Sequence, residues 1–356
     1  MRALVVTSVH RADDPRIRER TVRSLAAAFE VRYATRSPGP SRGGDHEWVE
    51  LKGGRVRRWW GALRQMCRGG VEVVSVHDPE LIPAALLARL FRRVPIVVDV
   101  HEDVPAQVRH KAWVPRLLRP AAAWAAGRAL RLAERFGTVT LAELNYRHLF
   151  RRDHPVFPNY PAAGSLPPLA PDAGYLVYVG DVTEERGALD MVEAVGLIPE
   201  RLPLRLVGRC REDLAERLRR RAGELGVELE IVGPLPHYEA MAVVAEASAG
   251  FSLLHDLPNY RASMPTKVIE YLAMGVPVVA SDLPGIREAL AGRAAVEVVP
   301  PGHAAAAAEA VARLLAEEAR EGAVLQAPVV RRALVWPDDA VRGVYLEAAA
   351  APFMRS

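Results

Sequence analysis

The sequence predicts an α/β protein built from two doubly wound parallel-sheet domains. Short apolar runs without polar alternation, which are typical of buried parallel strands, alternate along the chain with helical patterns. This rhythm stops in a segment rich in Pro, Ala and Gly that reaches Ala173, and it starts again at Leu176. The length of 356 residues also suits two hydrophobic cores better than one. We expect domains over residues 1–163 and 164–335 and a closing helix over 336–356.

The first domain opens with a strand over Arg2–Thr7, a loop, and a helical pattern that ends at Ala28. The loop holds His10 and Arg16 but lacks the glycines of a dinucleotide-binding fingerprint, so NAD binding is not expected. Its Asp13-Asp14-Pro15 run is also what the start of an ordinary helix requires. Further strands of this domain are expected at Val31–Thr35, Val71–Val76, Ile96–Val100 and Thr138–Leu141.

Two of these strands end in a histidine followed by an acidic residue. His77-Asp78 follows one strand, and His101-Glu102 follows the next. The carboxyl edge of an open parallel sheet is where ligands bind. A single histidine is more often structural, but two at equivalent strand ends favour a site.

The second domain repeats the strand and helix rhythm. At the end of its first strand, Gly180 permits a ligand to approach the backbone, and Arg186 lies close enough along the chain to reach a diphosphate there. The strands of this domain are expected at Leu176–Val179, Leu204–Val207, Leu229–Val232, Gly250–Leu254, Val276–Ala280 and Ala294–Val299.

A short helix precedes the fifth of these strands. It should begin near Met264 or Pro265 and stop at Gly275, which places Lys267 and Glu270 on one face near the positive end of the helix dipole. The helix-start amides and the ammonium group could hold phosphates, while the carboxylate could accept hydrogen bonds from sugar hydroxyls. A solvated ion pair on an ordinary helix explains the same two residues.

The stretch from Pro265 to Glu288 resembles the donor-binding signature of the retaining family-4 glycosyltransferases. Their GT-B fold has two Rossmann-like domains facing across a cleft, and the last helix crosses back to the first domain. Their Glu-x7-Glu motif is matched at its second position by Glu270, which implies ribose binding, whereas Ala262 replaces the first glutamate. A subgroup with a Ser-x-Pro-Thr-Lys pattern resembles Ser263–Lys267 and also lacks that glutamate.

The resemblance assigns roles to residues in both domains. The first domain is expected to bind the acceptor and the second the nucleotide sugar, while Asp181 stands where the family often has a second basic residue. The expected acceptor-side residues are His10 and Arg16, which the resemblance implies, and His77, Asp78 and Glu102, which follow from their place at strand ends. The implied donor-binding residues are Gly180, Arg186, Gly233, Pro234, Tyr238, Met264, Pro265, Thr266, Lys267 and Glu270. The implied catalytic residues are His101, Arg186, Lys267 and Glu270.

The implied reaction is metal-independent transfer from a nucleotide-diphosphate sugar with retention. UDP-hexose or UDP-N-acetylhexosamine is expected over GDP-mannose on family frequency, with no separate cofactor and no metal ion. No Asp-x-Asp pair suited to Mg²⁺ follows a predicted strand. A nucleotide-sugar 2-epimerase of the same fold, or a nucleotide-sugar binding module that has lost transfer, remains the alternative.

Charge is divided unevenly along the chain. Residues 1–163 hold 28 basic and 16 acidic side chains, a net +12, whereas the remainder has a net −8. The first domain could therefore meet an anionic membrane, and the acceptor could be a small molecule, a glycan, a lipid-linked group or a carrier protein. Trp124 and its neighbouring arginines in Arg109–Phe136 fit peripheral attachment, but packing on the sheet and an arginine-rich codon bias fit as well.

The expected location is the cytoplasm, with attachment to the inner face of the membrane as a possibility. No apolar run reaches the length of a membrane span, and the N-terminus becomes charged too early for a signal peptide. No nucleic-acid partner is expected. The two cysteines, Cys67 and Cys210, lie far apart and indicate neither a disulfide framework nor a zinc site.

Overall fold

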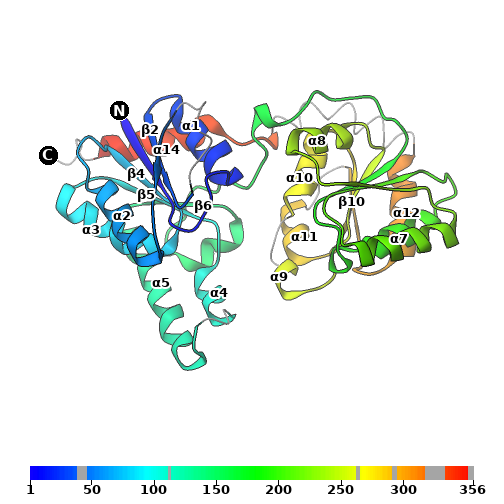
Figure 1. Cartoon of the computed structure of the whole chain (residues 1–356), viewed down its shortest axis with the longest axis horizontal. Helices are drawn as coiled ribbons and strands as arrows, with labels where there is room; N and C mark the ends of the chain where they lie inside the picture. Colours follow the sequence, from blue (N-terminus) through cyan, green and yellow to red (C-terminus); the bar gives the residue numbers. More distant parts are fainter. Residues whose placement is uncertain (38–45, 111–113, 262–264, 291–294, 317–332, 352–356) are drawn as a thin grey trace. The chain divides into compact units, whose positions relative to one another are not determined.

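The computed structural model describes residues 1–37, 46–110, 114–261, 265–290, 295–316 and 333–351. The chain forms two compact units (Figure 1). One consists of Met1–Asn159 with the chain from Trp336 on, and the other is Tyr160–Val335. Among the described residues, no helix combines the length and the apolar character needed to cross a bilayer.

The first unit contains a six-stranded parallel sheet in the order β3-β2-β1-β4-β5-β6. The strands are β1 (Arg2–Val6), β2 (Glu30–Thr35), β3 (His46–Glu50), β4 (Val73–Val76), β5 (Ile96–Val100) and β6 (Thr138–Leu141). Sequence analysis did not anticipate β3. This edge strand is only half-buried and carries charged residues, so it lacks the apolar run of the others.

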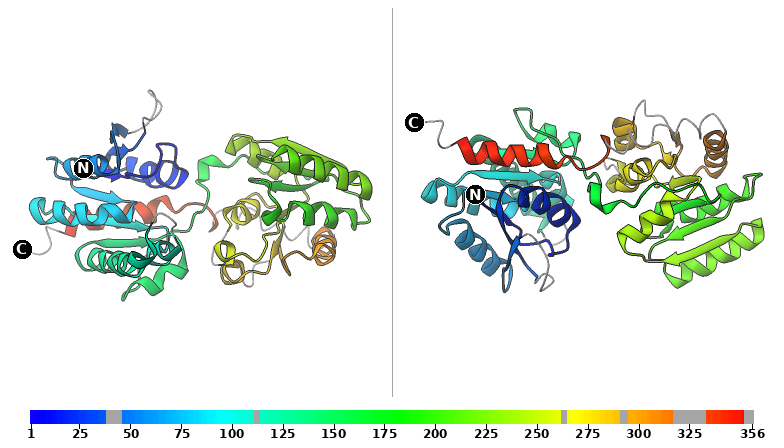
Figure 2. Two further views of the ribbon diagram at one scale, coloured as in Figure 1. Left: turned by 60° about the horizontal axis from the view of Figure 1, so that its bottom comes forward. Right: turned by 90° about the horizontal axis from the view of Figure 1, so that it is seen from above.

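Helices cover both faces of this sheet (Figure 2). Helices α2, α3 and α5 pack on one face, and η1, α1 and α14 pack on the other. The helical segments are η1 (Pro15–Val22), α1 (Arg23–Ala26), α2 (Arg55–Met66), η2 (Pro79–Leu81), α3 (Ile82–Arg92), α4 (Val104–His110), η3 (Arg116–Leu118), α5 (Arg119–Phe136), η4 (Leu144–Leu149) and α14 (Asp338–Ala350). The Asp14 carboxylate accepts the backbone N–H groups of Arg16 and Ile17, so its capping role is confirmed.

The second unit contains another six-stranded parallel sheet, in the order β12-β11-β10-β7-β8-β9. The strands are β7 (Leu176–Val179), β8 (Leu204–Val207), β9 (Leu229–Gly233), β10 (Ala249–Ser252), β11 (Val278–Ser281) and β12 (Val296–Val299). Both sheets have the same doubly wound order, which reverses between β1 and β4 in the first and between β7 and β10 in the second. The predicted α/β fold with two parallel sheets is confirmed.

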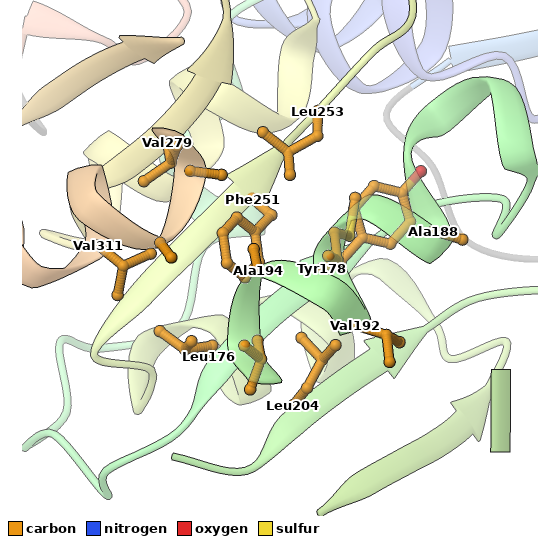
Figure 3. Close-up of a cluster of buried hydrophobic side chains, with 14 of the residues drawn as sticks. Leu176, Tyr178, Ala188, Val192, Ala194, Leu204, Phe251, Leu253, Val279 and Val311 are labelled. Carbon is orange, nitrogen blue, oxygen red and sulfur yellow. The ribbon is translucent and has the colours of Figure 1, made fainter. Parts of the chain in front are cut away.

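The helices of the second unit also form two layers. Helices α6, α7 and α12 enclose the core drawn in Figure 3, in which Phe251 lies between Tyr178 and Val311. Helices α8, α10 and α11 cover the opposite face. The helical segments are η5 (Ala163–Ser165), η6 (Glu184–Arg186), α6 (Ala188–Gly196), α7 (Glu212–Leu225), α8 (His237–Ala245), α9 (Pro258–Arg261), α10 (Thr266–Ala273), α11 (Pro284–Leu290) and α12 (Ala304–Leu315). Ligands of doubly wound sheets bind at the carboxyl ends of strands where the order reverses.

Candidate functional site

The carboxyl end of β7 brings Gly180 together with two cations. Gly180 has a φ of 137°, which side chains rarely adopt. A Cβ atom at this position would lie 3.1 Å from Lys267 Nζ and 3.4 Å from one terminal nitrogen of Arg186. Because glycine has no side chain, the space beside its backbone stays open, and the Lys267 and Arg186 cations both border it. This is the convergence expected from sequence for Gly180, Arg186 and Lys267.

A second glycine fixes the loop that carries Arg186. Gly187 follows Arg186 with a φ of 76°, and a Cβ atom there would lie 2.1 Å from the backbone oxygen of Leu253. The loop after β7 is consequently held against the chain that follows β10. These are the two neighbouring strands at which the sheet order reverses.

Lys267 is a buried cation at the second position of α10. Its side chain covers the ring of Tyr178, with Nζ 3.9 Å from the ring centroid. Among the described residues, Nζ has no hydrogen-bond partner. Burial, together with the nearby charge of Arg186, lowers the pKa of Lys267 to about 7, although Glu270 and Asp181 oppose the shift. An anion placed here would supply the missing partner.

Helix α10 ends as the sequence predicts and starts one or two residues later than expected. Pro265 precedes its first residue, Thr266, and no side chain caps the helix start. Gly275, with a φ of 75°, follows the C-terminal end. Met264, together with Ala262 and Ser263 of the motif, lies outside the described residues.

Glu270 lies one turn after Lys267 and has a partner that sequence analysis did not identify. His237 Nε2 donates a hydrogen bond to Glu270 Oε1 at 2.9 Å. His237 begins α8, directly after the loop that contains Gly233 and Pro234, and Tyr238 beside it is 53% exposed. The loop expected to face a nucleobase is thus joined to the carboxylate expected to bind a ribose.

Asp181 is paired with a basic residue of the neighbouring strand loop. Arg209 Nε donates to Asp181 Oδ1 at 3.2 Å. Both side chains are largely exposed. The basic residue that the family often places after the glycine is absent, but Arg209 brings a guanidinium group to the same end of the sheet.

In the first unit, His10 connects Asp14 to His101. His10 Nδ1 donates to Asp14 Oδ2 at 2.8 Å, and His10 Nε2 lies 3.3 Å from His101 Nε2. The hydrogen bond to Asp14 raises the pKa of His10, whereas burial lowers the pKa of His101. At this distance one ring nitrogen can donate to the other, so His10 is placed to orient His101. Glu102 is half-buried beside them.

Asp99 organises the buried polar residues under this pair. Its carboxylate accepts two hydrogen bonds from Arg16, at 2.7 and 2.8 Å, and His77 Nδ1 lies 3.3 Å from Asp99 Oδ2. Burial opposes ionisation, but the charge of Arg16 holds the pKa of Asp99 well below its usual range. Arg16 also donates to Asn159 Oδ1 at 2.7 Å. Arg16 and His77 therefore support the strand ends, and their contact with an acceptor stays a prediction.

Asp78 fixes the loop that presents His10. Its Oδ2 atom accepts hydrogen bonds from Thr7 Oγ1 at 2.9 Å and from the backbone N–H of Val9 at 3.2 Å. The side chain is 4% exposed. Its observed role is to hold the loop after β1, and an acceptor contact remains a prediction.

One group of potential metal ligands occurs among the described residues, formed by His77, Asp99 and His101 within 4.8 Å of one another. Both Asp99 oxygens already accept hydrogen bonds from Arg16. A guanidinium group beside the same carboxylate opposes a second cation by charge repulsion. The arrangement fits a hydrogen-bonded ion pair better than a metal site.

Sequence analysis missed Asp99, His237 and the pairing of Asp14 with His10. Asp99 offered a signal, since it is a charged residue inside the apolar run Ile96–Val100. A carboxylate in a buried strand needs a partner such as Arg16. His237 offered none, because its contact with Glu270 joins helices 33 residues apart in the chain.

Residues 173–317 match the family described as glycosyl transferases group 1. A phosphatidyl-myo-inositol mannosyltransferase of Mycobacterium leprae is 28% identical over 272 residues, which cover 73% of this chain and 67% of that protein. Two solved structures align over 99% or more of both chains. They are sucrose-phosphate synthase of Thermosynechococcus elongatus (16% identity, TM-score 0.72) and Anabaena HepE in complex with UDP (12% identity, TM-score 0.71).

These comparisons agree with the architecture of the two units. The structural likeness shows the GT-B fold. The family match spans most of the second unit, including Gly180, Arg186, Lys267 and Glu270. Together with the curated relative, it identifies the chain as a glycosyltransferase.

Proposed function

We propose that this glycosyltransferase transfers a hexose or N-acetylhexosamine from a UDP-linked donor, with retention at the anomeric carbon and without a divalent metal. The second unit would hold the nucleotide diphosphate. The observation that carries the proposal is Lys267, a buried ammonium group without a hydrogen-bond partner among the described residues, aimed at the same spot as Arg186. Two cations at one strand end suit a diphosphate.

The same two cations would also help the nucleotide diphosphate to leave. As the bond between the sugar and the phosphate breaks, negative charge accumulates on the leaving diphosphate. Lys267 and Arg186 would stabilise this charge more strongly in the transition state than in the bound donor, which is the requirement for catalysis. In the retaining mechanism that the family resemblance implies, the leaving phosphate takes the proton of the acceptor. No separate base is then required from the protein.

Glu270 is proposed to bind the ribose. Its side chain is 12% exposed, and it has a second oxygen, Oε2, besides the Oε1 atom that accepts from His237. A ribose diol could use the carboxylate while His237 orients it. Tyr238 and the Gly233-Pro234 loop, which lie next to His237 in the chain, would face the base.

UDP is favoured as the nucleotide by one similar structure, Anabaena HepE, which was solved with UDP. The mannosyltransferase relative acts on an inositol lipid according to its name. We therefore propose a lipid-linked acceptor at the inner face of the membrane, bound through the first unit, and a catalytic role for His101. His10 would orient His101 for this role, and Glu102 would lie beside the acceptor.

A screen by thermal unfolding tests the donor assignment. UDP and UDP-sugars should raise the unfolding temperature more than GDP or GDP-mannose, because a ligand that binds the folded state stabilises it according to its affinity. A larger shift with GDP-mannose would overturn the choice of UDP. Proton NMR of the product would then read the anomeric configuration, and an inverted product would contradict retention.

Variants separate transfer from its alternatives. Lys267→Ala should lower turnover more than donor affinity, and Glu270→Ala should weaken nucleotide binding. Lys52→Ala is a matched control, because Lys52 is 82% exposed on the first unit.

Release of a free 2-epimer without acceptor would instead indicate an epimerase. Binding of UDP-sugar without transfer or hydrolysis would indicate a binding module.

A further inference from the structure

Most of the large apolar side chains that are exposed among the described residues belong to one helical layer of the first unit. Scattered exposed apolar residues are normal, but a group of them on one face marks an interaction surface. The group consists of Val56 and Trp60 on α2, Leu87, Leu90 and Phe91 on α3, and Leu117, Leu118, Trp124, Leu132 and Phe136 on η3 and α5. Because α2, α3 and α5 pack on the same face of the sheet, their outward sides form one surface, termed here the basic apolar face.

Helix α5 contributes a stripe in which apolar and basic residues alternate. Trp124 is 70% exposed, and Leu132 and Phe136 follow at helical spacing on the same side. Arg128 and Arg135 lie on that side as well and are exposed. The helix extends beyond the sheet with α4 alongside it (Figure 1). Its outward side is therefore open along its length.

Helix α3 contributes a second stripe that is mainly apolar. Leu90 and Phe91 are 73% and 72% exposed, and Leu87 lies one turn earlier. Arg92 and Arg93 follow at the end of the helix and are also exposed. Helix α3 packs against both α2 and α5, so its stripe lies in the middle of the basic apolar face.

This face carries no exposed carboxylate. Helices α2, α3 and α5 contain a single acidic residue, Glu134, which is buried. Glu134 Oε1 accepts hydrogen bonds from the backbone N–H groups of Arg151 and Arg152 and from His154 Nε2. The Glu134 carboxylate is thus hydrogen-bonded inside the first unit and does not add negative charge to the face. The exposed helix α7 of the second unit differs, because its arginines are paired with acidic neighbours such as Glu212 and Glu224.

A groove next to this face lies at the C-terminal ends of α3 and α5, where β5 and β6 begin. It has a volume of about 790 Å³. It is lined by Arg89, Arg93, Arg135 and Arg152, by Leu90 and Phe136, and also by Glu134 and by Ala348 and Ala351 at the end of α14. The arginines suit phosphate groups, and the apolar side chains suit acyl chains.

We propose that the basic apolar face docks on a bilayer that contains anionic phospholipids. Arginines would meet the headgroup phosphates while Trp124, Leu90 and Phe91 enter the interface, which is the composition of interfacial membrane-binding helices. A polyanion such as nucleic acid would leave the exposed leucines without partners. The inference extends the membrane-side acceptor proposed above, but it rests on the first unit alone and would survive failure of the donor assignment.

Vesicle flotation with the full chain tests the proposal. The protein should float with vesicles of phosphatidylcholine mixed with phosphatidylglycerol, and much less with phosphatidylcholine alone. Replacement of Arg128, Arg131 and Arg135 by Gln should weaken vesicle binding about a hundredfold, because each arginine near an anionic surface contributes roughly fivefold. Raised salt should weaken wild-type binding in the same direction. Replacement of Leu90, Phe91 and Trp124 by Ser should also reduce binding.

The control variant replaces Arg217, Arg219 and Arg220 of α7 by Gln, which removes the same charge from the second unit. It should bind vesicles as the wild type does, and circular dichroism should show all variants folded, since the replaced side chains are exposed or, at Arg217, half-exposed. Equal loss in the α7 variant would mean that net charge alone drives binding and would overturn the proposal. Failure of the wild type to float would also overturn it. So would a concentration-dependent dimer abolished by the serine variant, because the face would then join two copies of the chain.

Discussion

At the scale of single residues, the surroundings of Lys267 disfavour its ammonium form unless an anion is bound. Its ammonium group is buried beside Arg186 and has no hydrogen-bond acceptor among the described residues. Such a group destabilises the unliganded protein. The same group favours a diphosphate, because the ligand supplies the missing charge and hydrogen bonds. Stability without donor and affinity for donor should therefore change in opposite directions when Lys267 is replaced.

Lys267→Met should stabilise the unliganded protein. The folded-state pKa of about 7 lies below the ordinary value of 10.5, so between these values the unfolded state binds more protons. For this group, stability consequently rises with pH through that window, and the cost of burial is fully present below it. Removing the amine at neutral pH should raise the free energy of unfolding by about 2 kcal/mol. Urea unfolding measures it, and Lys52→Met should leave the free energy unchanged. A destabilised Lys267→Met would contradict the account.

Donor affinity should depend on pH through the same residue. Only the ammonium form of Lys267 suits a diphosphate, and this form is lost in the free protein as the pH rises above about 7. The dissociation constant for UDP should therefore increase above that pH, by at most about tenfold per pH unit for one proton. Calorimetry across this range measures it. In Lys267→Arg, which keeps its charge, the dependence should disappear, and an unchanged dependence in that variant would assign the titration to another group.

Residue types at strand ends could be predicted from the sequence, but their partners could not. The spacing of Lys267 and Glu270 places both on one helical turn whatever surrounds the helix. The bonds from His237 to Glu270 and from Arg16 to Asp99 depend on how distant elements pack. Local sequence patterns do not predict such long-range contacts. Arg16 shows the consequence, since its acceptor contact stays a prediction while its bond to Asp99 was not anticipated.

At the scale of elements, the loop after β7 depends on Gly187, the residue that follows Arg186. Gly187→Ala would bring a methyl group into the backbone oxygen of Leu253 and force a left-handed φ on alanine. We expect a loss of about 3 kcal/mol in stability and weaker UDP binding, because Arg186 is adjacent. Gly223→Ala in α7 is the control. Nothing lies within 4 Å of the added methyl there, so it should stabilise by about 1 kcal/mol.

Thermal unfolding and UDP calorimetry check both variants. If Gly187→Ala matched the wild type in both measurements, the loop would not need its contact with Leu253.

Strands with continuous apolar runs were predictable within a few residues, and exposed or polar elements were not. The predicted strand Val276–Ala280 forms at Val278–Ser281. Strand β3 was missed because an edge strand buries few side chains and its charged residues resemble a loop. The long helical region Arg109–Phe136 contains an irregular stretch around Arg116–Leu118, where Pro115 and Pro120 interrupt the pattern.

At the scale of the whole molecule, the chain builds two similar units and returns to the first after completing the second. The returning segment contributes Trp336, Val341 and Tyr345 to the core of the first unit. Trp336 Nε1 donates to Ser24 Oγ at 2.9 Å, and the Tyr345 hydroxyl lies 2.7 Å from Ser75 Oγ. The first unit is therefore completed only by the end of the described chain.

Truncation after Val335 should destabilise the first unit and leave donor binding intact. The missing segment uncovers apolar side chains of the first unit, whereas Lys267 and Glu270 belong to the second. We expect an early unfolding transition that UDP does not shift and a later transition that UDP raises. Differential scanning calorimetry with and without UDP measures both. Loss of UDP binding in the truncated chain would show that the second unit does not bind the nucleotide by itself.

The central claim is that Lys267 and Arg186 bind the diphosphate of the donor, and a comparison of UDP with uridine isolates that contribution. Calorimetry below pH 7 gives the ratio of the two affinities. In the wild type UDP should bind far more tightly than uridine. In Lys267→Met the ratio should fall by about tenfold or more, because one charge-assisted contact is lost, while Glu270→Gln should weaken both ligands and keep the ratio. An unchanged ratio in Lys267→Met would contradict the claim.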